Sequence, residues 1–232
     1  MQLMEAPEAY QVEKWLWTDA DFDLMGWHDA SVYAWRLLGQ ELLLDIDYIF
    51  QWNQPEVDGT SFTFWVAPAT LVFLGVQNVE FDFDFIEGLS KENALEIDGI
   101  ERKLENEWMI QLRNGHMGFQ ATGFEQYIRR APSFEFGQQV SFPNRAGNSF
   151  EKVTGEARSD AFNFAEFRTS NTWRLYQVML AQARVRQQLD QLLDERAAGN
   201  IALKRFLQQK RELQDRINHF GTELRGTRFD RS

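Results

Sequence analysis

The 232 residues of this chain suffice for one sizeable domain or two small ones, and 44% of them are hydrophobic, including 20 Phe and 8 Trp. Such an apolar, aromatic-rich composition excludes a disordered chain, and the length allows a buried core without disulfides or metals. The absence of cysteine excludes disulfide bonds, thiolate catalysis and zinc sites with cysteine ligands.

The net charge of −11 is unevenly distributed along the chain. Residues 1–171 contain 12 Lys and Arg against 28 Asp and Glu, a net charge of −16, whereas residues 172–232 contain 12 against 7, a net charge of +5. The first part should repel nucleic acid and attract basic partners, while the second could do the opposite, although a solvated surface explains either composition. The shift predicts an acidic antiparallel β domain over 1–171 and a basic helical tail over 172–232.

The chain shows no targeting or membrane signal. Its start, MQLMEAPEAYQVEKW, has neither the basic beginning nor the apolar stretch of a signal peptide. The longest apolar runs, such as LVFLGV, fall short of the roughly 20 residues that a membrane helix needs. We therefore expect a cytoplasmic protein that does not interact with membranes.

Residues 10–130 show the period-two alternation of β-strands, one after another. Leu42, Leu44 and Ile46 alternate with Asp45 and Asp47, which predicts a strand with one face in the core and the other largely towards water. Phe81, Phe83 and Phe85 alternate with Asp82 and Asp84 in the same way. The other predicted strands are 31–38, 61–67, 71–74, 95–103, 108–113 and 116–122.

The predicted strands are joined by tight turns. Between two of them, Arg113-Asn114-Gly115-His116 predicts a hairpin, because Asn-Gly readily supplies the positive φ of a type I′ turn. With no helical segment between the strands, the pattern favours an antiparallel meander curled into a sandwich or half-barrel. Residues 131–171 are rich in turn residues and predict a long surface loop with one more strand near 162–167.

From Thr172 the apolar residues follow the 4-3 spacing of amphipathic helices. Gly199 suits the residue that closes one helix and Asn200 can cap the next, which favours a helical hairpin. The heptad phase is uninterrupted, however, so a single coiled-coil helix stays open. The fold class is therefore α+β, an antiparallel β-rich body followed by a helical hairpin or coiled coil. The residues expected to mediate oligomerisation are Val178, Val185, Leu189, Leu192, Leu203, Phe206, Leu213, Ile217 and Phe220.

The most distinctive local cluster is Met25-Gly26-Trp27-His28-Asp29. His28 could act as a catalytic base oriented by Asp29, with Trp27 as a binding residue beside them. Neighbours on a strand point to opposite faces, so His28 and Asp29 need a bulge or turn to cooperate. The structural alternative is that one of them hydrogen-bonds the backbone where the chain enters the first long strand.

Two pairs of carboxylates are further candidates for binding. Asp45 and Asp47 project on one face of a strand, as do Asp82 and Asp84, and such pairs could share a proton or hold a cation. We prefer the ordinary interpretation, the solvated face of an antiparallel strand. His28, His116 and His219 show no metal-ligand spacing, so neither a metal nor a cofactor is predicted.

Three segments carry resemblances to known families. The run DADFDLMGWHDASVYAW, then ELLLDIDYIFQW and FTFWVAPATLVFLGVQNVEFDFD, resembles an uncharacterised family of bacterial β-rich proteins with a Trp-His-Asp motif. An Ile-Asp-Gly-Ile strand, Glu107-Trp108-Met109-Ile110 and Gly118-Phe119-Gln120-Ala121-Thr122-Gly123 follow, and over about residues 10–130 the chain looks like some acidic bacterial immunity proteins. Residues 189–217 resemble short bacterial C-terminal helical hairpins. These resemblances imply a bacterial cytoplasmic protein with a binding role, and they bring no catalytic residues.

Three functions remain as expectations. The first is a non-catalytic protein-interaction module whose acidic body binds a basic protein, while its helical tail forms homo-oligomers. The second is a barrel-like carrier that encloses a small apolar ligand among aromatic side chains. The third is a hydrolase or isomerase that uses His28 and nearby carboxylates. No sequence motif identifies an enzyme, and the first function is preferred.

Overall fold

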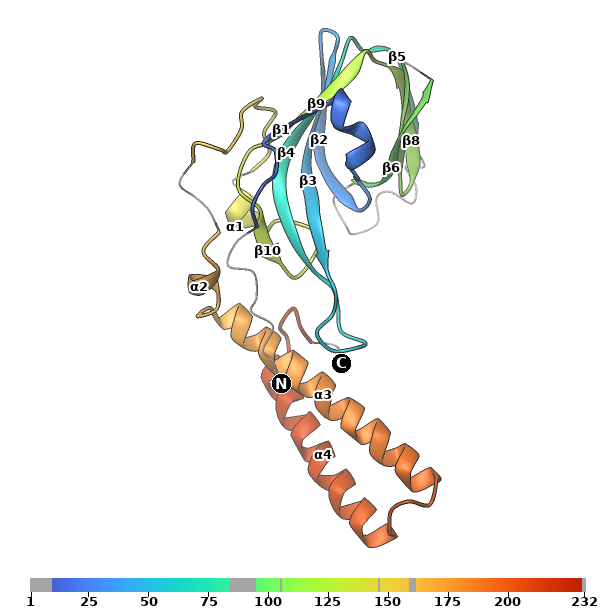
Figure 1. Cartoon of the computed structure of the whole chain (residues 1–232), viewed down its shortest axis with the longest axis vertical. Coiled ribbons are helices and arrows are strands. Elements are labelled where there is room, and N and C mark those ends of the chain that lie inside the picture. Colours follow the sequence, from blue (N-terminus) through green and yellow to red (C-terminus); the bar gives the residue numbers. More distant parts are fainter. Residues whose placement is uncertain (1–9, 84–94, 105, 146, 159–161, 231–232) are drawn as a thin grey trace. The chain divides into compact units, whose positions relative to one another are not determined.

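The structure is a computed structural model that describes residues 10–83, 95–104, 106–145, 147–158 and 162–230 (Figure 1). By their internal contacts the residues form two compact units. The first comprises residues 1–53 and 62–162, and the second comprises residues 54–61 and 163–232. The first unit is the β-rich body, and the second contains the long C-terminal helices.

The body is built on a ten-stranded antiparallel sheet. Its strands follow the order β1-β9-β4-β3-β2-β6-β7-β8-β5, and β10 pairs with β4 beside β9. A 3-10 helix, η1 (Asp19–Leu24), follows β1. The strands are β1 Leu16–Thr18, β2 Ala30–Leu38, β3 Glu41–Asn53, β4 Thr63–Leu74, β5 Gln77–Phe83, β6 Leu95–Leu104, β7 Glu107–Leu112, β8 Gly115–Gln120, β9 Gly123–Ile128 and β10 Ser133–Glu135.

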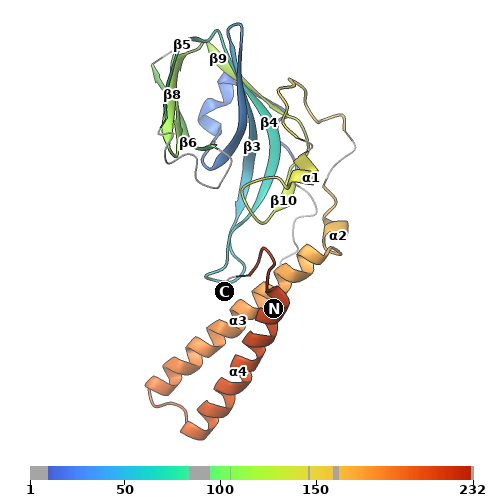
Figure 2. The same cartoon turned by 180° about the vertical axis from the view of Figure 1, so that it is seen from behind.

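The sheet curls so that β6, β7, β8 and β5 face the other strands across the core, with η1 between the two halves (Figures 1 and 2). Phe73 of β4 meets Trp108 of β7, with ring centroids 5.3 Å apart. Phe22 of η1 contacts both Trp108 and Phe124 of β9. The predicted α+β class with an antiparallel body is confirmed.

The strand β4 is continuous where the sequence predicts two strands separated at 68–70. Pro68 accepts a hydrogen bond from Arg129 N, so its missing N–H lies on the side of β9 and β10. There β10 pairs with 64–66 and β9 with 69–74. The proline falls where one neighbour ends and the next begins, a position that needs no ladder hydrogen bond.

The hairpin between β7 and β8 is confirmed, but its turn differs from the prediction. Leu112 pairs with Gly115, so the loop residues are Arg113 and Asn114. Neither has a positive φ, which both residues of a type I′ turn require. The Asn-Gly pair therefore straddles the end of the turn, and Gly115 begins β8.

The sequence predicts one solvated face for β3, and this prediction is wrong. Positions 42 to 49 are all buried. The segment after β9 folds back over the outer face of the sheet; it contains β10 and the short helix α1 (Phe142–Arg145). Val140 of this segment packs with Ile49 and Val66 in a small apolar cluster. The alternating side chains of β3 are therefore buried on both faces, one in the apolar core and the other under the segment after β9.

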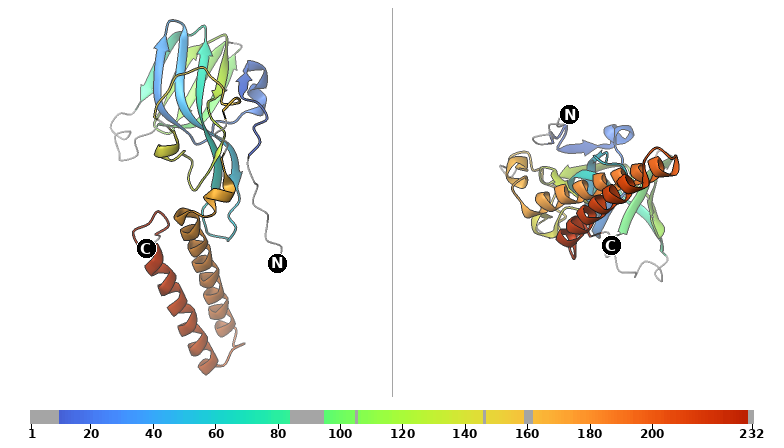
Figure 3. Two further views of the ribbon diagram at one scale, coloured as in Figure 1. Left: turned by 90° about the vertical axis from the view of Figure 1, so that its left-hand side faces the viewer. Right: turned by 90° about the horizontal axis from the view of Figure 1, so that it is seen from below.

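The second unit is a helical hairpin of α3 (Asn171–Ala197) and α4 (Leu203–Leu224), which lie side by side (Figures 1 and 3). The Ser170 side chain caps α3 by accepting a hydrogen bond from Trp173 N. Ahead of it, 164–167 form the short helix α2 (Phe164–Phe167) in place of the predicted strand, capped by Asn163.

The turn at Gly199 explains why the chain forms a hairpin and not one continuous helix. Gly199 has a φ of +78°, and its N–H donates to Arg196 O. Asn200 N donates to Glu195 O, which completes the Schellman arrangement at a helix end. Asn200 does not cap α4 as expected, because the capping position is Ala202. Beyond the turn, Ile201 packs against Leu192 and Phe206.

Candidate functional site

The turn before β2 brings His28 and Asp29 into one site. Ala30 N donates to Trp27 O and Asp29 N donates to Ile97 O, which fix the turn against β6. Asp29 has a φ of +63°, a left-handed conformation that costs a non-glycine residue about 1–2 kcal/mol. Such strain is common at functional sites. Trp27 is buried, and its Nε1 donates to Gln126 Oε1 at 2.8 Å, so Trp27 anchors the turn from the core side.

The two side chains approach each other without making a strong hydrogen bond. His28 Nε2 lies 3.6 Å from Asp29 Oδ1, and His28 Nδ1 lies 3.1 Å from the backbone oxygen of Asp98. The second contact fits the structural alternative, a hydrogen bond to the backbone at the start of β2. A ring that donates from Nδ1 needs a second proton on Nε2 to pair with Asp29, and it is then a cation.

Asp29 belongs to a small carboxyl cluster. Its Oδ2 accepts from Gln138 Nε2 at 2.8 Å, and the carboxyl group of Glu96 is a close neighbour. Burial raises the pKa of Glu96, and the neighbouring carboxyl group of Asp29 raises it further, although Arg113 acts in the opposite direction. Arg113 Nη2 donates to Glu96 Oε1 at 2.5 Å. Asp98, which is exposed, adds a third carboxylate to the field at Glu96.

Aromatic rings border the carboxyl cluster. The His28 ring stacks on Trp52, with an interplanar angle of 7° and centroids 6.2 Å apart. Trp52 in turn contacts Phe62 and Phe64 edge-on. His28, Trp52 and Phe62 are all exposed. Exposed rings beside carboxylates provide the two features that bind a basic side chain, a π face and a negative charge.

Asp45 and Asp47 lie elsewhere, on the outer face of β3, where both are fully buried. Asp45 Oδ1 accepts from Arg129 Nη2 at 2.5 Å and from Arg145 Nη2 at 2.6 Å. Asp47 Oδ1 accepts from Arg145 Nε at 3.0 Å. Asp45, Asp47, Arg129 and Arg145 form what we call the arginine clamp, in which two carboxylates balance two guanidinium groups in charge. Through Arg145 the clamp joins the segment after β9, the covering segment, to the sheet. The predicted solvated face is thereby corrected.

The remaining contacts of the clamp saturate its polar atoms. Tyr33 donates to Asp47 Oδ2 at 2.9 Å, as does Val140 N at 2.8 Å. The guanidinium of Arg145 lies over the Tyr33 ring, 3.7 Å from its centroid. Burial raises the pKa of Asp47, partly offset by Arg145, and burial together with Asp47 raises the pKa of Tyr33. The clamp is suited to holding structure, because every charge already has a partner.

The other predicted residues do not join these sites. Asp82 is exposed on β5, where it pairs with His116 of β8, and Asp84 lies outside the described residues. His219 is on α4, 3.5 Å from Glu223. In the described part of the chain, no group of three or more His, Asp or Glu has the arrangement of a metal site. None of the helices described there combines the length and apolarity that crossing a lipid bilayer requires.

Most of the stripe predicted to mediate oligomerisation packs inside the hairpin. Val185, Leu192, Phe206 and Ile217 are buried, whereas Leu203 is 55% exposed. The half-buried members are Val178, Leu189, Leu213 and Phe220. Leucines next to the stripe are also open: Leu193 is 41% and Leu207 is 55% exposed.

Many aromatic residues of the body fill its core. Phe73 lies 4.7 Å from Phe119 between ring centroids, and Trp108 lies 6.0 Å from Phe124. All four side chains are buried. These rings pack against each other and fill this part of the interior.

Sequence reasoning identified the His28–Asp29 pair but missed its partners. Glu96 and Gln138 lie on other strands and loops, and no local pattern links either of them to the turn before β2. Trp52 lies near the end of β3, and no sequence pattern distinguishes it from the other aromatic residues of the strands. No known protein family, curated protein or solved structure matches this chain.

Proposed function

We propose that this chain is a non-catalytic protein-interaction module whose acidic β-body binds a basic partner protein. The observation that carries the proposal is the exposed His28–Trp52 ring stack beside the carboxyl groups of Asp29, Glu96 and Asp98. A Lys or Arg side chain placed there would meet aromatic faces and carboxylates together. The net charge of −16 over residues 1–171 would steer a basic partner towards the body.

The geometry favours binding over the enzyme alternative. His28 Nδ1 lies 3.1 Å from the backbone oxygen of Asp98, whereas Nε2 lies 3.6 Å from Asp29 Oδ1, so the ring is oriented by the backbone and not by a carboxylate. The alternative of an apolar carrier has less support, because the aromatic rings of the body contact one another. An immunity-like role in a bacterial cytoplasm is the form of this proposal that the sequence resemblances favour.

We further propose that the hairpin assembles copies of the chain. The buried apolar residues of α3 and α4 pack against each other within one hairpin. The exposed leucines Leu193, Leu203 and Leu207 would therefore supply the contact between copies. One helical hairpin that leaves apolar side chains exposed can complete a four-helix bundle with a second.

The binding proposal can be tested with a fluorescent deca-arginine peptide and the full-length chain. We expect saturable binding that weakens as NaCl rises from about 0.05 M to about 0.3 M. Trp52→Ala and Asp98→Asn should each weaken binding by about tenfold, equivalent to 1.4 kcal/mol. Asp82→Asn, which removes the same charge from an exposed position on β5, is the matched control. Equal losses in all three variants, or no binding at all, would overturn the proposal.

A further inference from the structure

The seam between α3 and α4 contains an unusual polar position. Gln182 occupies a core position of the heptad and is only 8% exposed. Its Nε2 donates to the backbone oxygen of Ile217 on α4 at 3.1 Å. The facing residue is Gly221, where an added Cβ would lie 3.3 Å from that nitrogen. The missing side chain at Gly221 therefore makes the space that the Gln182 amide uses.

Neither residue is the choice that helix stability favours. Glycine in a helix interior costs about 1 kcal/mol relative to alanine, and a buried amide needs partners for its oxygen as well as its nitrogen. A pair of apolar residues at this level would continue the stripe. The hydrogen bond from Gln182 Nε2 to Ile217 O can set the register of the two helices, and Gln182 Oε1 accepts no hydrogen bond from the described residues.

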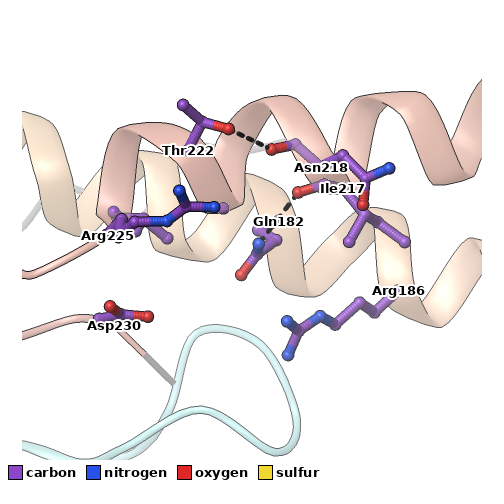
Figure 4. Close-up of a pocket in the computed structure, with 9 residues that line it drawn as sticks. Gln182, Arg186, Ile217, Asn218, Thr222, Arg225 and Asp230 are labelled. Atoms are coloured by element: carbon purple, nitrogen blue, oxygen red, sulfur yellow. Dashed lines mark hydrogen bonds between the residues drawn. The ribbon is translucent and has the colours of Figure 1, made fainter. Parts of the chain in front are cut away.

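Around this pair the hairpin and the residues after α4 form a pocket of about 290 Å³ (Figure 4). In Figure 4 the Gln182 oxygen points away from Ile217, into the space bordered by Arg225, Asp230 and Arg186. Thr222 lines the same pocket and donates to Asn218 O. All of these residues belong to the second unit.

The charges around the pocket are one-sided. Arg186 and Arg225 are exposed, and within the described residues neither has an ion pair or hydrogen bond with an acidic group. Among the described lining residues Asp230 is the one acidic residue, and its Oδ2 accepts a hydrogen bond from Gly226 N at 2.8 Å. Among the described lining residues two guanidinium groups stand against one carboxylate, and Gln182 Oε1 faces the same space.

The geometry points to a binding site for a small oxyanion that also carries a hydroxyl or amino group. Its carboxylate or phosphate would bind Arg186 and Arg225, for which oxyanions are the matching partners. Its hydroxyl or amino group would donate to Gln182 Oε1. The pocket volume lies at the lower end for ligand sites, which suits a molecule of a few carbon atoms.

The test uses the full-length chain with three probes: inorganic phosphate, glycerate and glycerol 3-phosphate. Titration calorimetry measures affinity, and NMR follows the Gln182 side-chain amide. We expect glycerate or glycerol 3-phosphate to bind at least about tenfold more tightly than inorganic phosphate. The preferred probe of the two distinguishes a carboxylate site from a phosphate site. No binding by either, or equal binding of all three, would overturn the inference.

Variants separate the site from general charge effects. Arg186→Ala and Arg225→Ala should each weaken binding by at least about tenfold. Arg211→Ala removes the same charge from an exposed position of α4 outside the pocket and should leave affinity within about twofold. Gln182→Leu should abolish binding and preserve helicity, because leucine continues the apolar stripe. Binding that survives Gln182→Leu, or that falls equally in all three arginine variants, contradicts the assignment.

Discussion

Arg145 Nη2 donates to Asp45 Oδ1 at 2.6 Å across 100 residues of chain, and both side chains are shielded from solvent. Asp45 Oδ1 also accepts a hydrogen bond from Arg129 Nη2, so one carboxylate forms ion pairs with two guanidinium groups. The contact holds the segment after β9 against the outer face of β3. Its energetic importance lies in what its loss would leave behind, which is buried charge without a partner.

Asp45→Asn should therefore destabilise the body strongly. Removing one member of a buried ion pair typically costs about 3–5 kcal/mol, because the remaining charges stay buried without compensation. Chemical denaturation measures the loss. Asp82→Asn makes the same chemical change at an exposed position and should alter the free energy of unfolding by less than about 0.5 kcal/mol. Matching unfolding curves for the two variants would show that the clamp contributes little.

Glu96→Gln should change how stability depends on pH. The pKa of Glu96 is raised from its ordinary value of 4.5, so the folded protein binds this proton more tightly than the unfolded chain. The stability that this protonation contributes is fully present below pH 4.5 and is lost as pH rises through the raised pKa.

Glutamine keeps a neutral side chain at every pH, so the melting temperature of Glu96→Gln relative to wild type should increase from pH 4 to pH 7. Thermal unfolding at the two pH values measures this difference. A gap between the two proteins that stays constant, or that narrows towards pH 7, would contradict the role of Asp29 and burial at Glu96.

Gly199→Ala should destabilise the helical hairpin. An added Cβ at this position would meet no atom within 4 Å, so a steric clash is not the cause. The cause is the φ of +78°, a backbone conformation that alanine adopts only with strain. A left-handed alanine costs about 1–2 kcal/mol. Gly118→Ala is the control, because that glycine also has open space and no positive φ. Circular dichroism on heating reports both variants, and a raised melting temperature for Gly199→Ala would instead indicate a continuous helix in solution.

Substitutions of exposed leucines and of a buried phenylalanine in α4 should have different effects, the first on assembly and the second on folding stability. The double variant Leu203→Glu and Leu207→Glu places charge on exposed positions, so it should lower the molar mass in light scattering with little change in melting temperature. Phe206→Ala removes a buried ring and should cost about 3–5 kcal/mol of stability. An unchanged mass in the double variant, or a monomeric wild type, would count against assembly through the hairpin.

The sequence predicts the class of the fold because periodicity is a local signal. Alternation located β2, β3, β6, β7 and β8, and the 4-3 spacing located α3 and α4. Local signals fail where the deciding interaction is distant. Alternation in β3 cannot reveal that a segment some 90 residues later covers its second face, and the alternation near Phe164 cannot reveal that Asn163 starts a helix.

The same limit applies to the candidate site. His28 and Asp29 stand out because they are adjacent and chemically distinctive. Their interaction depends on the positive φ of Asp29, a conformation that the sequence does not encode in a recognisable motif. Glu96 and Gln138 reach the site only through the pairing of β2 with β6 and the fold of the covering segment.

The arginine clamp also sets an order of events during protein synthesis. A nascent chain presents Asp45 and Asp47 on the ribosome long before Arg129 and Arg145 have been made. Because carboxylates are buried at low cost only with their partners, the outer face of β3 must stay wet until Arg145 emerges. A chain that ends before residue 129 would therefore leave the outer face of β3, with Asp45, Asp47 and Ile49, open to solvent.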